Sequence, residues 1–204
     1  MNIITEIEQG SEEWLALRAG KVTASRFSDV MAKGRGGAPS KTRDSYMKQL
    51  AAEILTGQPE EMYSNKYMEW GNECEPQARS MYEFNHDREV NQVAFIEHND
   101  FVGVSPDGLI GSDGLIEIKC PKTTTQIDYY LSGKFPSKYE AQVQGQLMVS
   151  NREWCDFVSF DPRINGSASY FEVRVYRDEK YIAELDNQIR YFVNELKELL
   201  EKLK

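Results

Sequence analysis

The sequence predicts an α/β protein with a mixed central β-sheet flanked by helices, and three observations lead to this prediction. Apolar residues recur at helical spacing through most of residues 1–85. Residues 86–177 change to short β-rich runs separated by turn residues, and residues 178–204 return to a helical pattern. Helices, then strands, then alternating helix and strands are typical of an α/β sandwich. A chain of 204 residues with 40% hydrophobic content suits a single domain with one substantial core.

Helix start and stop signals predict the N-terminal helices. Ser11 is an N-cap candidate followed by two acidic residues, and Gly20 ends this first helix. A second helix opens at Thr23, a third covers residues 42–56 before Gly57, and a fourth covers residues 68–84. The glycine-rich residues 34–40 predict a mobile loop.

β-branched and aromatic runs predict the strands of the middle region, and a long apolar stripe predicts the last helix. The expected strands cover residues 90–96, 101–104, 115–120, 154–160 and 170–176. One helix is expected at residues 138–149, and a last helix at residues 179–203 presents Ile182, Leu185, Ile189, Phe192, Leu196 and Leu203 on one side. This stripe is either core packing or a subunit contact.

Composition narrows the class of protein. No run approaches 18 apolar residues and the N-terminus lacks a secretory pattern, so we expect a cytoplasmic protein that does not enter the membrane. Three widely spaced cysteines fit reduced thiols and form no zinc or iron-sulfur pattern. The net charge of -9 argues against a general nucleic-acid binder, although the local charge at a groove matters more than the sum.

The segment from Ser105 to Pro121 carries the residues of a candidate site. In a strand, Glu117 and Lys119 share one face, and Asp107 lies ten residues before Glu117 across a turn. If the two strands pair, the two carboxylates meet and one pKa would be raised unless a divalent cation lies between them. Mg²⁺ prefers such oxygen ligands, and the backbone carbonyl of Ile118 offers another. With Lys119 alongside, this arrangement suits metal-assisted phosphodiester hydrolysis.

The same residues also allow a simpler interpretation. Alternating charges in a strand are typical of one solvated sheet face, and Asp-Gly is typical of a turn. His86 and His98 are too few and too poorly placed for a Ser-His-Asp triad. The short pattern alone therefore leaves a site and a wet surface both open.

Several separate segments together resemble the lambda-exonuclease-like, YqaJ-type viral recombinase family of the PD-(D/E)xK nuclease superfamily. In chain order these segments are residues 14–25 (WLALRAGKVTAS), 70–75 (WGNECE), 105–108 (SPDG), 117–121 (EIKCP), 141–144 (AQVQ) and 160–163 (FDPR). The resemblance implies a restriction-endonuclease-like core, and with the terminal helix it covers nearly the whole chain.

The resemblance also implies roles for individual residues. Asp107 and Glu117 would ligate Mg²⁺, for which Mn²⁺ substitutes, with Glu75 assisting at a second ion or in support. Spacing alone makes Glu73 as plausible as Glu75 for this assisting role, and it also allows either residue to be a solvated charge on a helix. Lys119 and Gln142 would act at the scissile phosphate or the attacking water, although Gln142 also reads as an ordinary exposed helix residue. The broader RecB-like group tends to carry Gln-x-x-x-Tyr, whereas position 146 here is Gln.

A second set of residues would bind a terminal 5'-phosphate. The resemblance points to Arg18, Ser25 and Ser105, with Lys119 and Gln142 beside them. An arginine fork and serine hydroxyls suit phosphate oxygens, but Ser25 also reads as a helix cap and Arg18 as a surface charge. Weaker DNA-backbone contacts are expected from four basic side chains in the N-terminal quarter, namely Lys21, Arg26, Lys33 and Arg35.

The implied activity is that of a Mg²⁺-dependent phosphodiesterase, a 5'-to-3' exodeoxyribonuclease. It would degrade linear duplex DNA to mononucleotides and leave 3' overhangs for phage-type recombination with a single-strand annealing protein. Family members form toroidal homotrimers, and a phage or prophage origin in a bacterial host is implied. Two alternatives stay open: a non-catalytic acidic DNA mimic or binding protein of the same fold, and an endonuclease using the same metal site. A RecB-like or Cas4-like single-strand nuclease is disfavoured because a cysteine tetrad is missing.

Overall fold

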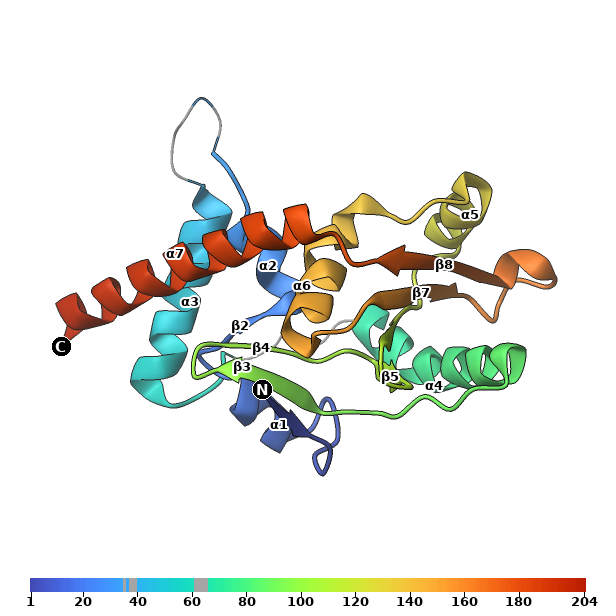
Figure 1. The fold of residues 1–204 in the computed structure, drawn as a ribbon, viewed down its shortest axis with the longest axis horizontal. Coiled ribbons are helices and arrows are strands. Elements are labelled where there is room, and N and C mark those ends of the chain that lie inside the picture. The colour runs from blue at the N-terminus through green and yellow to red at the C-terminus, as the bar shows by residue number, and fades with distance from the viewer. Residues whose placement is uncertain (35, 37–39, 61–65) are drawn as a thin grey trace.

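Two four-stranded β-sheets with helices around them form the protein in the computed structural model, which describes residues 1–34, 36, 40–60 and 66–204 (Figure 1). The first sheet has the order β1-β3-β4-β2, and its strands are β1 (Asn2–Ile4), β2 (Val22–Thr23), β3 (Phe95–Asn99) and β4 (Val102–Val104). The second sheet has the order β5-β6-β7-β8, with β5 (Gly108–Ile110), β6 (Gly114–Lys119), β7 (Trp154–Phe160) and β8 (Tyr170–Tyr176). The mixed α/β class predicted from the sequence is confirmed, but with two sheets.

The chain passes from one sheet to the other between Val104 and Gly108. The expectation that the strand before Asp107 pairs with the strand of Glu117 was therefore wrong, because β4 and β6 belong to different sheets. A short strand that follows Asp107, β5, pairs antiparallel with β6 instead, with Gly108 opposite Ile116. β6 pairs parallel with β7, and β7 pairs antiparallel with β8.

Local signals explain most helix boundaries. The helical segments are α1 (Glu12–Arg18), η1 (Ala24–Arg26), α2 (Phe27–Val30), α3 (Lys41–Thr56), α4 (Lys66–His86), α5 (Thr123–Ser132), η3 (Ser137–Tyr139), α6 (Glu140–Ser150), η4 (Ser167–Ser169) and α7 (Glu179–Leu203). The Ser11 hydroxyl accepts a hydrogen bond from the Trp14 backbone N–H at 3.2 Å and caps α1. Gly57 ends α3 with φ 66°, a left-handed conformation that glycine adopts without strain.

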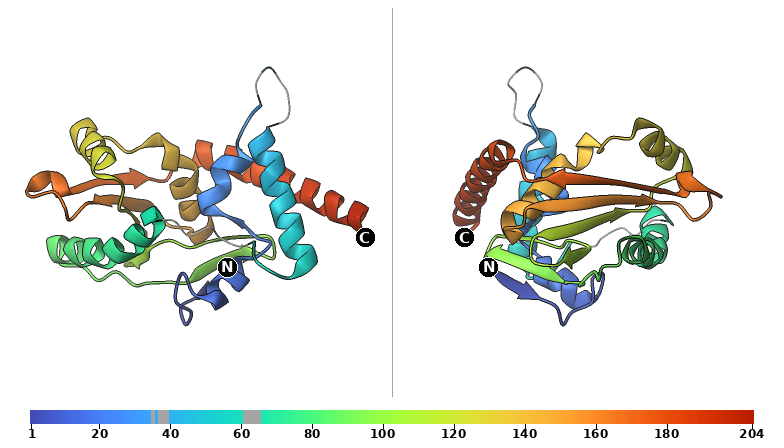
Figure 2. Two further views of the ribbon diagram at one scale, coloured as in Figure 1. Left: turned by 180° about the vertical axis from the view of Figure 1, so that it is seen from behind. Right: turned by 45° about the vertical axis from the view of Figure 1, so that its right-hand side comes forward.

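Helix α6 lies in the centre of the molecule and joins the two sheets (Figures 1 and 2). A Cβ added to Gly145 would lie 2.2 Å from Cδ2 of Phe27, so the glycine permits α6 to pack tightly against α2. Val143 and Leu147 of α6 and Leu185 of α7 are fully buried in the main core. The helix is thereby fixed between the N-terminal segments and the second sheet.

Several boundaries differ from the predictions. Residues 90–93 are not part of a strand, which begins at Phe95, and residues 123–132, for which no helix was predicted, form α5. Strands β1 and β2 lie inside the N-terminal region expected to be mostly helical. Of the predicted α7 stripe, Leu203 is 54% exposed and the other members are buried, namely Ile182, Leu185, Ile189, Phe192 and Leu196. The loop expected at residues 34–40 lies partly outside the described residues.

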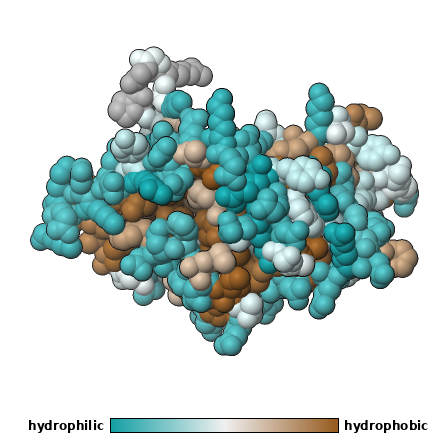
Figure 3. Space-filling model, in the orientation of Figure 1, coloured by the Kyte–Doolittle hydropathy of each residue, from teal (hydrophilic) through white to brown (hydrophobic). Residues whose placement is uncertain are grey.

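The surface is mostly hydrophilic on the face in Figure 3, with apolar residues in separate patches. In the described part of the chain, no helix combines the length and apolar character needed to cross a membrane. Cys74, Cys120 and Cys155 are unpaired in the structure.

Candidate active site

The sheet crossover places Asp107 beside Glu117. Asp107 lies between β4 and β5, and its Oδ2 accepts a hydrogen bond from the Ile118 backbone N–H at 2.6 Å. Glu117 is on β6 with only 1% of its surface exposed. The antiparallel pairing of β5 with β6 brings the start of β5 back against the end of β6. The structure thus brings together the two carboxylates that the sequence placed ten residues apart.

The negative charges of these neighbouring carboxylates repel one another. Burial raises the pKa of Asp107 well above its ordinary value, and the neighbouring Glu117 and Glu75 raise it further. Lys119 and the Ile118 N–H act in the opposite direction without offsetting these effects. An additional positive charge at this position would therefore stabilise the ionised form of Asp107.

Lys119 supplies a cation next to both carboxylates. Its Nζ forms an ion pair with Oε1 of Glu117 and lies 5.4 Å from the centre of the Tyr139 ring. Burial acts to lower the pKa of Lys119, but Glu117 and Asp107 outweigh burial and raise the pKa above its ordinary value. The side chain is accordingly an ammonium ion at neutral pH, suited to stabilise negative charge rather than to accept a proton.

Two glutamines on α6 hold the carboxylate of Glu117. The Nε2 atom of Gln142 donates to Oε1 at 2.6 Å, and the Nε2 atom of Gln146 donates to Oε2 at 2.7 Å. Residues four apart share one helix face, which is why both reach the same side chain. Gln142 was predicted at the site. Gln146 was noted only as a departure from the RecB-like pattern, because a buried and an exposed glutamine look alike in a sequence.

Glu75 lies further out on α4. Its Oε1 accepts a hydrogen bond from Nη2 of Arg79 at 2.6 Å, and its charge reaches Asp107 strongly enough to raise the pKa of that residue. Over the residues that the structure describes, no three His, Cys, Asp or Glu side chains converge as a ready metal cage. Glu73, the other candidate from spacing, is exposed on the same helix.

Arg18 and Ser105 meet directly next to this group. Nη1 of Arg18 donates to the Ser105 hydroxyl at 2.9 Å, and its guanidinium lies 4.0 Å from the centre of the Trp14 ring. The Trp14 indole N–H donates to the Ala94 carbonyl at 2.9 Å, which fixes the ring under the guanidinium. Burial lowers the pKa of Arg18 to about 10, so the side chain is still charged at neutral pH. Ser105 is two residues from Asp107, so the arginine is linked to the carboxylate segment.

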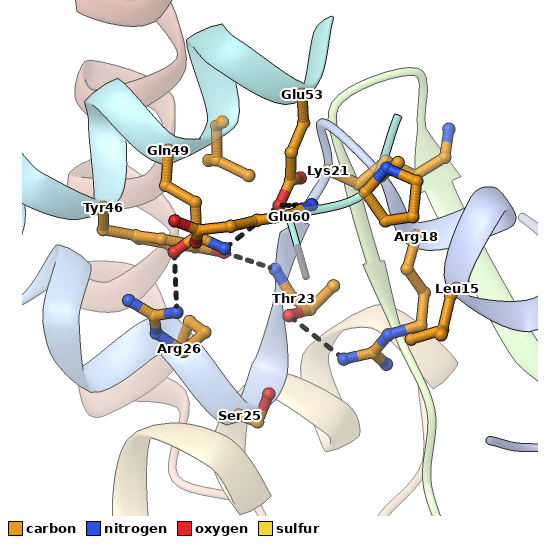
Figure 4. A pocket seen from close by; sticks show the side chains of 13 residues that line it. Leu15, Arg18, Lys21, Thr23, Ser25, Arg26, Tyr46, Gln49, Glu53 and Glu60 are labelled. Carbon is orange, nitrogen blue, oxygen red and sulfur yellow. Dashed lines mark hydrogen bonds between the residues drawn. The ribbon is translucent and has the colours of Figure 1, made fainter. Parts of the chain in front are cut away.

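Arg18 also lines a cavity of about 120 Å³ together with Ser25. Figure 4 shows Thr23 between Arg18 on one side and Tyr46 and Arg26 on the other, with Ser25 on the segment that follows Thr23. Nη2 of Arg18 makes a long contact of 3.4 Å with the Thr23 hydroxyl. Among the described residues no carboxylate is in ion-pair distance of Arg18, so its charge is available to an anion.

The four residues expected at the DNA backbone differ in their surroundings. Lys21 makes an ion pair with Glu97 at 3.5 Å, and Arg26 makes an ion pair with Asp29. Both charges are thus already balanced within the chain. Lys33 is exposed. Arg35 lies outside the described residues.

The donor set fits a hard divalent cation. Asp107 and Glu117 offer carboxylate oxygens, and Ile118 offers a backbone carbonyl. The pKa of Asp107 is raised first by burial and then by the negative charge of Glu117, and a bound cation would oppose both effects. Within the described part of the chain, the buried Oε1 atom of Gln146, on the side chain that bonds Glu117, has no hydrogen-bond partner, so a polar group is unsatisfied at this point.

Comparisons with known proteins identify the family and the fold of this chain. The model of the YqaJ-like viral recombinase domain matches residues 13–153. The crystal structure of an alkaline exonuclease (LHK-Exo) from Laribacter hongkongensis is 42% identical, with a TM-score of 0.87 over 95% of this chain and 96% of that one. The same enzyme in complex with dAMP is 43% identical, with a TM-score of 0.88 and the same coverage.

A more distant relative is uncharacterized protein R354 of Acanthamoeba polyphaga mimivirus, which is 28% identical over 172 residues. The alignment covers 76% of this chain but 29% of the mimivirus protein. The match to the family model extends over more than half of the chain. The protein therefore belongs to the YqaJ-like viral recombinase family, as the resemblance implied.

Proposed function

We propose that the protein is a divalent-cation-dependent exonuclease that degrades linear duplex DNA from 5'-phosphorylated ends in the 5'-to-3' direction. The observation that carries this proposal is the direct link between the two groups of the site. Ser105, which bonds Arg18, is two residues before Asp107, and Asp107 bonds the backbone next to Glu117. The proposed binding site for a terminal phosphate is thus adjacent to the two carboxylates proposed to act in hydrolysis.

The proposed chemistry follows from the residues of the chain. Arg18, with the Ser105 and Ser25 hydroxyls, would bind the terminal phosphate and fix the register of the strand. Lys119, an ammonium ion, would stabilise charge that develops on the scissile phosphate. Gln142 would orient the attacking water or a phosphate oxygen through its amide. A cation held by Asp107, Glu117 and the Ile118 carbonyl, with Glu75 nearby, would supply Lewis acidity and lower the pKa of water.

The proposed binding site for a terminal phosphate supports attack from an end rather than within the duplex. A free terminal phosphate carries more negative charge than a phosphodiester and can enter a pocket lined by Arg18. An uninterrupted strand has no terminal phosphate to place in this pocket. Stepwise hydrolysis of a duplex strand from its 5' end would release mononucleotides and leave a 3' overhang. A homotrimeric ring around DNA, a phage-type annealing partner and Mg²⁺ as the physiological ion complete the proposal.

A pair of DNA substrates tests it. Linear duplex with 5'-phosphates and covalently closed circles of the same sequence are incubated with the protein and Mg²⁺, with Glu117→Gln as the inactive control. We expect mononucleotides from the linear DNA and intact circles. Cutting of the circles would indicate an endonuclease, and binding without cleavage in Mg²⁺ or Mn²⁺ would indicate a non-catalytic DNA-binding protein.

A further inference from the structure

Gln146 is among the most buried polar residues of the chain, and the main hydrogen bond of its side chain is to Glu117. It has 0% exposure, and its Nε2 donates to Oε2 of Glu117 at 2.7 Å. The same nitrogen lies 3.5 Å from the Ser105 carbonyl, at the limit of a hydrogen bond. Gln146 therefore lies between the segment that carries Ser105 and the strand that carries Glu117.

Burying an amide in this way is unfavourable unless both of its ends are bonded. The Oε1 atom of Gln146 is buried and has no partner among the described residues. An apolar side chain of similar size would fill the same space without an unsatisfied oxygen. Core packing alone therefore does not explain a glutamine at this position, whereas its hydrogen bond to Glu117 does.

The two glutamines that bond Glu117 are not equivalent. Gln142 is half-buried and shares Oε1 of Glu117 with Lys119, whereas Oε2 is bonded by Gln146 and by no other residue that the structure describes. The helix that carries both glutamines is held in place at Gly145, because the Phe27 ring occupies the space that a Cβ of residue 145 would need. The half-buried Gln142 is thus placed to give up its hydrogen bond to Glu117 and to bond the substrate instead. The fully buried Gln146 is not.

We propose that Gln146 is a positioning residue: its amide fixes the orientation of the Glu117 carboxylate, and thereby the affinity of the site for a divalent cation. The inference rests on the function proposed above. Hydrogen bonds that orient a metal-binding carboxylate typically change metal affinity or activity by about 10- to 100-fold when removed. Gln146 acts through Glu117 and does not touch the substrate.

A matched control exists on the same helix. Gln144 is 1% exposed, its Nε2 donates to the Tyr176 carbonyl at 2.9 Å, and its Oε1 accepts from the Asp178 N–H at 2.9 Å. Its side chain thus joins α6 to the end of β8 and the start of α7, away from Glu117. Gln146→Met and Gln144→Met remove the same group from equally buried positions, but only Gln146→Met removes a bond to Glu117.

The test measures Mn²⁺ binding to the full-length protein by electron paramagnetic resonance, together with the Mg²⁺ dependence of linear-duplex degradation. For Gln146→Met we expect about tenfold or more weaker Mn²⁺ binding and a matching rise in the Mg²⁺ concentration for half-maximal rate, with unchanged KM for DNA. Gln144→Met should lower the melting temperature without changing Mn²⁺ affinity. Gln146→Asn keeps an amide but withdraws it by one methylene, and should weaken Mn²⁺ binding in the same direction.

Equal Mn²⁺ affinity in wild type and in a folded Gln146→Met or Gln146→Asn protein would overturn the inference while leaving the proposed function intact. A loss of Mn²⁺ affinity as large in Gln144→Met would also overturn it, because the effect would then be general destabilisation of α6. A wild-type protein that neither binds Mn²⁺ nor degrades linear DNA would overturn both the inference and the proposed function.

Discussion

Replacing Arg18 by methionine should remove most of the preference for a 5'-phosphate. Among the described residues, the guanidinium hydrogen-bonds to two neutral hydroxyls, those of Ser105 and Thr23, and it stacks on the Trp14 ring. Methionine keeps most of the volume over the ring but removes the charge and the N–H donors. A hydrogen bond to a charged group contributes about 1.5 to 3 kcal/mol, which corresponds to roughly a 10- to 150-fold effect on rate or affinity.

The assay compares kcat/KM on two linear duplexes that differ only in a 5'-phosphate or a 5'-hydroxyl. For wild type the phosphorylated end should be preferred, and for Arg18→Met the ratio should approach one. Arg26→Met is the matched control, because Arg26 lines the same cavity but already pairs with Asp29. An unchanged ratio in Arg18→Met, or an equal loss of preference in Arg26→Met, would refute the role assigned to Arg18.

Three further outcomes are expected. Lys119→Met should slow single-turnover cleavage by about 10²- to 10³-fold, as for loss of other transition-state donors, and a rate near wild type would contradict its role. Gly145→Val places a Cβ 2.2 Å from a Phe27 ring carbon and should lower the free energy of unfolding in urea by about 1 to 3 kcal/mol. Burial acts to raise the pKa of Asp161, but hydrogen bonds from Arg163 and Thr123 outweigh it and hold the pKa below its ordinary value. This stabilisation is present above the unfolded-state pKa of about 4 and is lost as the pH falls through the folded-state pKa of Asp161. The melting-temperature difference between wild type and Arg163→Met should therefore shrink in acid. A difference that grows in acid would contradict this role of Arg163.

The elements with strong periodicity were predictable from the sequence. Strands β7 and β8 and helix α7 begin and end where the pattern placed them, and Ser11 and Gly57 bound their helices as expected. Helix α5 was missed because it begins with three threonines, which have low helix propensity, and no side chain caps it. Tertiary contacts stabilise this helix instead, since the buried Gln126 donates to the carbonyls of Ser159 and Ala168.

The division into two sheets was not predictable from local pattern. Strand β5 has only three residues and follows a Pro-Asp-Gly sequence that is typical of a turn. The antiparallel pairing of β5 with β6, from Gly108 opposite Ile116 to Ile110 opposite Gly114, shows that the chain has changed sheets. The close approach of Asp107 and Glu117 was nonetheless anticipated, because a tight connection of either kind folds the two residues back together.

The candidate site was predictable in its residue types but not in its hydrogen bonds. The motif and the resemblance indicated Asp107, Glu117 and Lys119, and the family itself is confirmed by the comparison over residues 13–153. The bond between Arg18 and Ser105 depends on residues 87 positions apart, which no local pattern encodes. The role of Gln146 depends on the depth of its burial, which only the packing of α6 defines.

The proposed function requires Asp107 and Glu117 to hold a divalent cation together, beside Lys119. Anomalous diffraction at the manganese edge, from crystals of catalytically active protein soaked in Mn²⁺, tests it most directly. We expect a manganese peak at coordination distance from oxygens of both carboxylates, and we expect this peak to disappear in Asp107→Asn crystals. A manganese peak bound elsewhere, or none in active crystals, would contradict it.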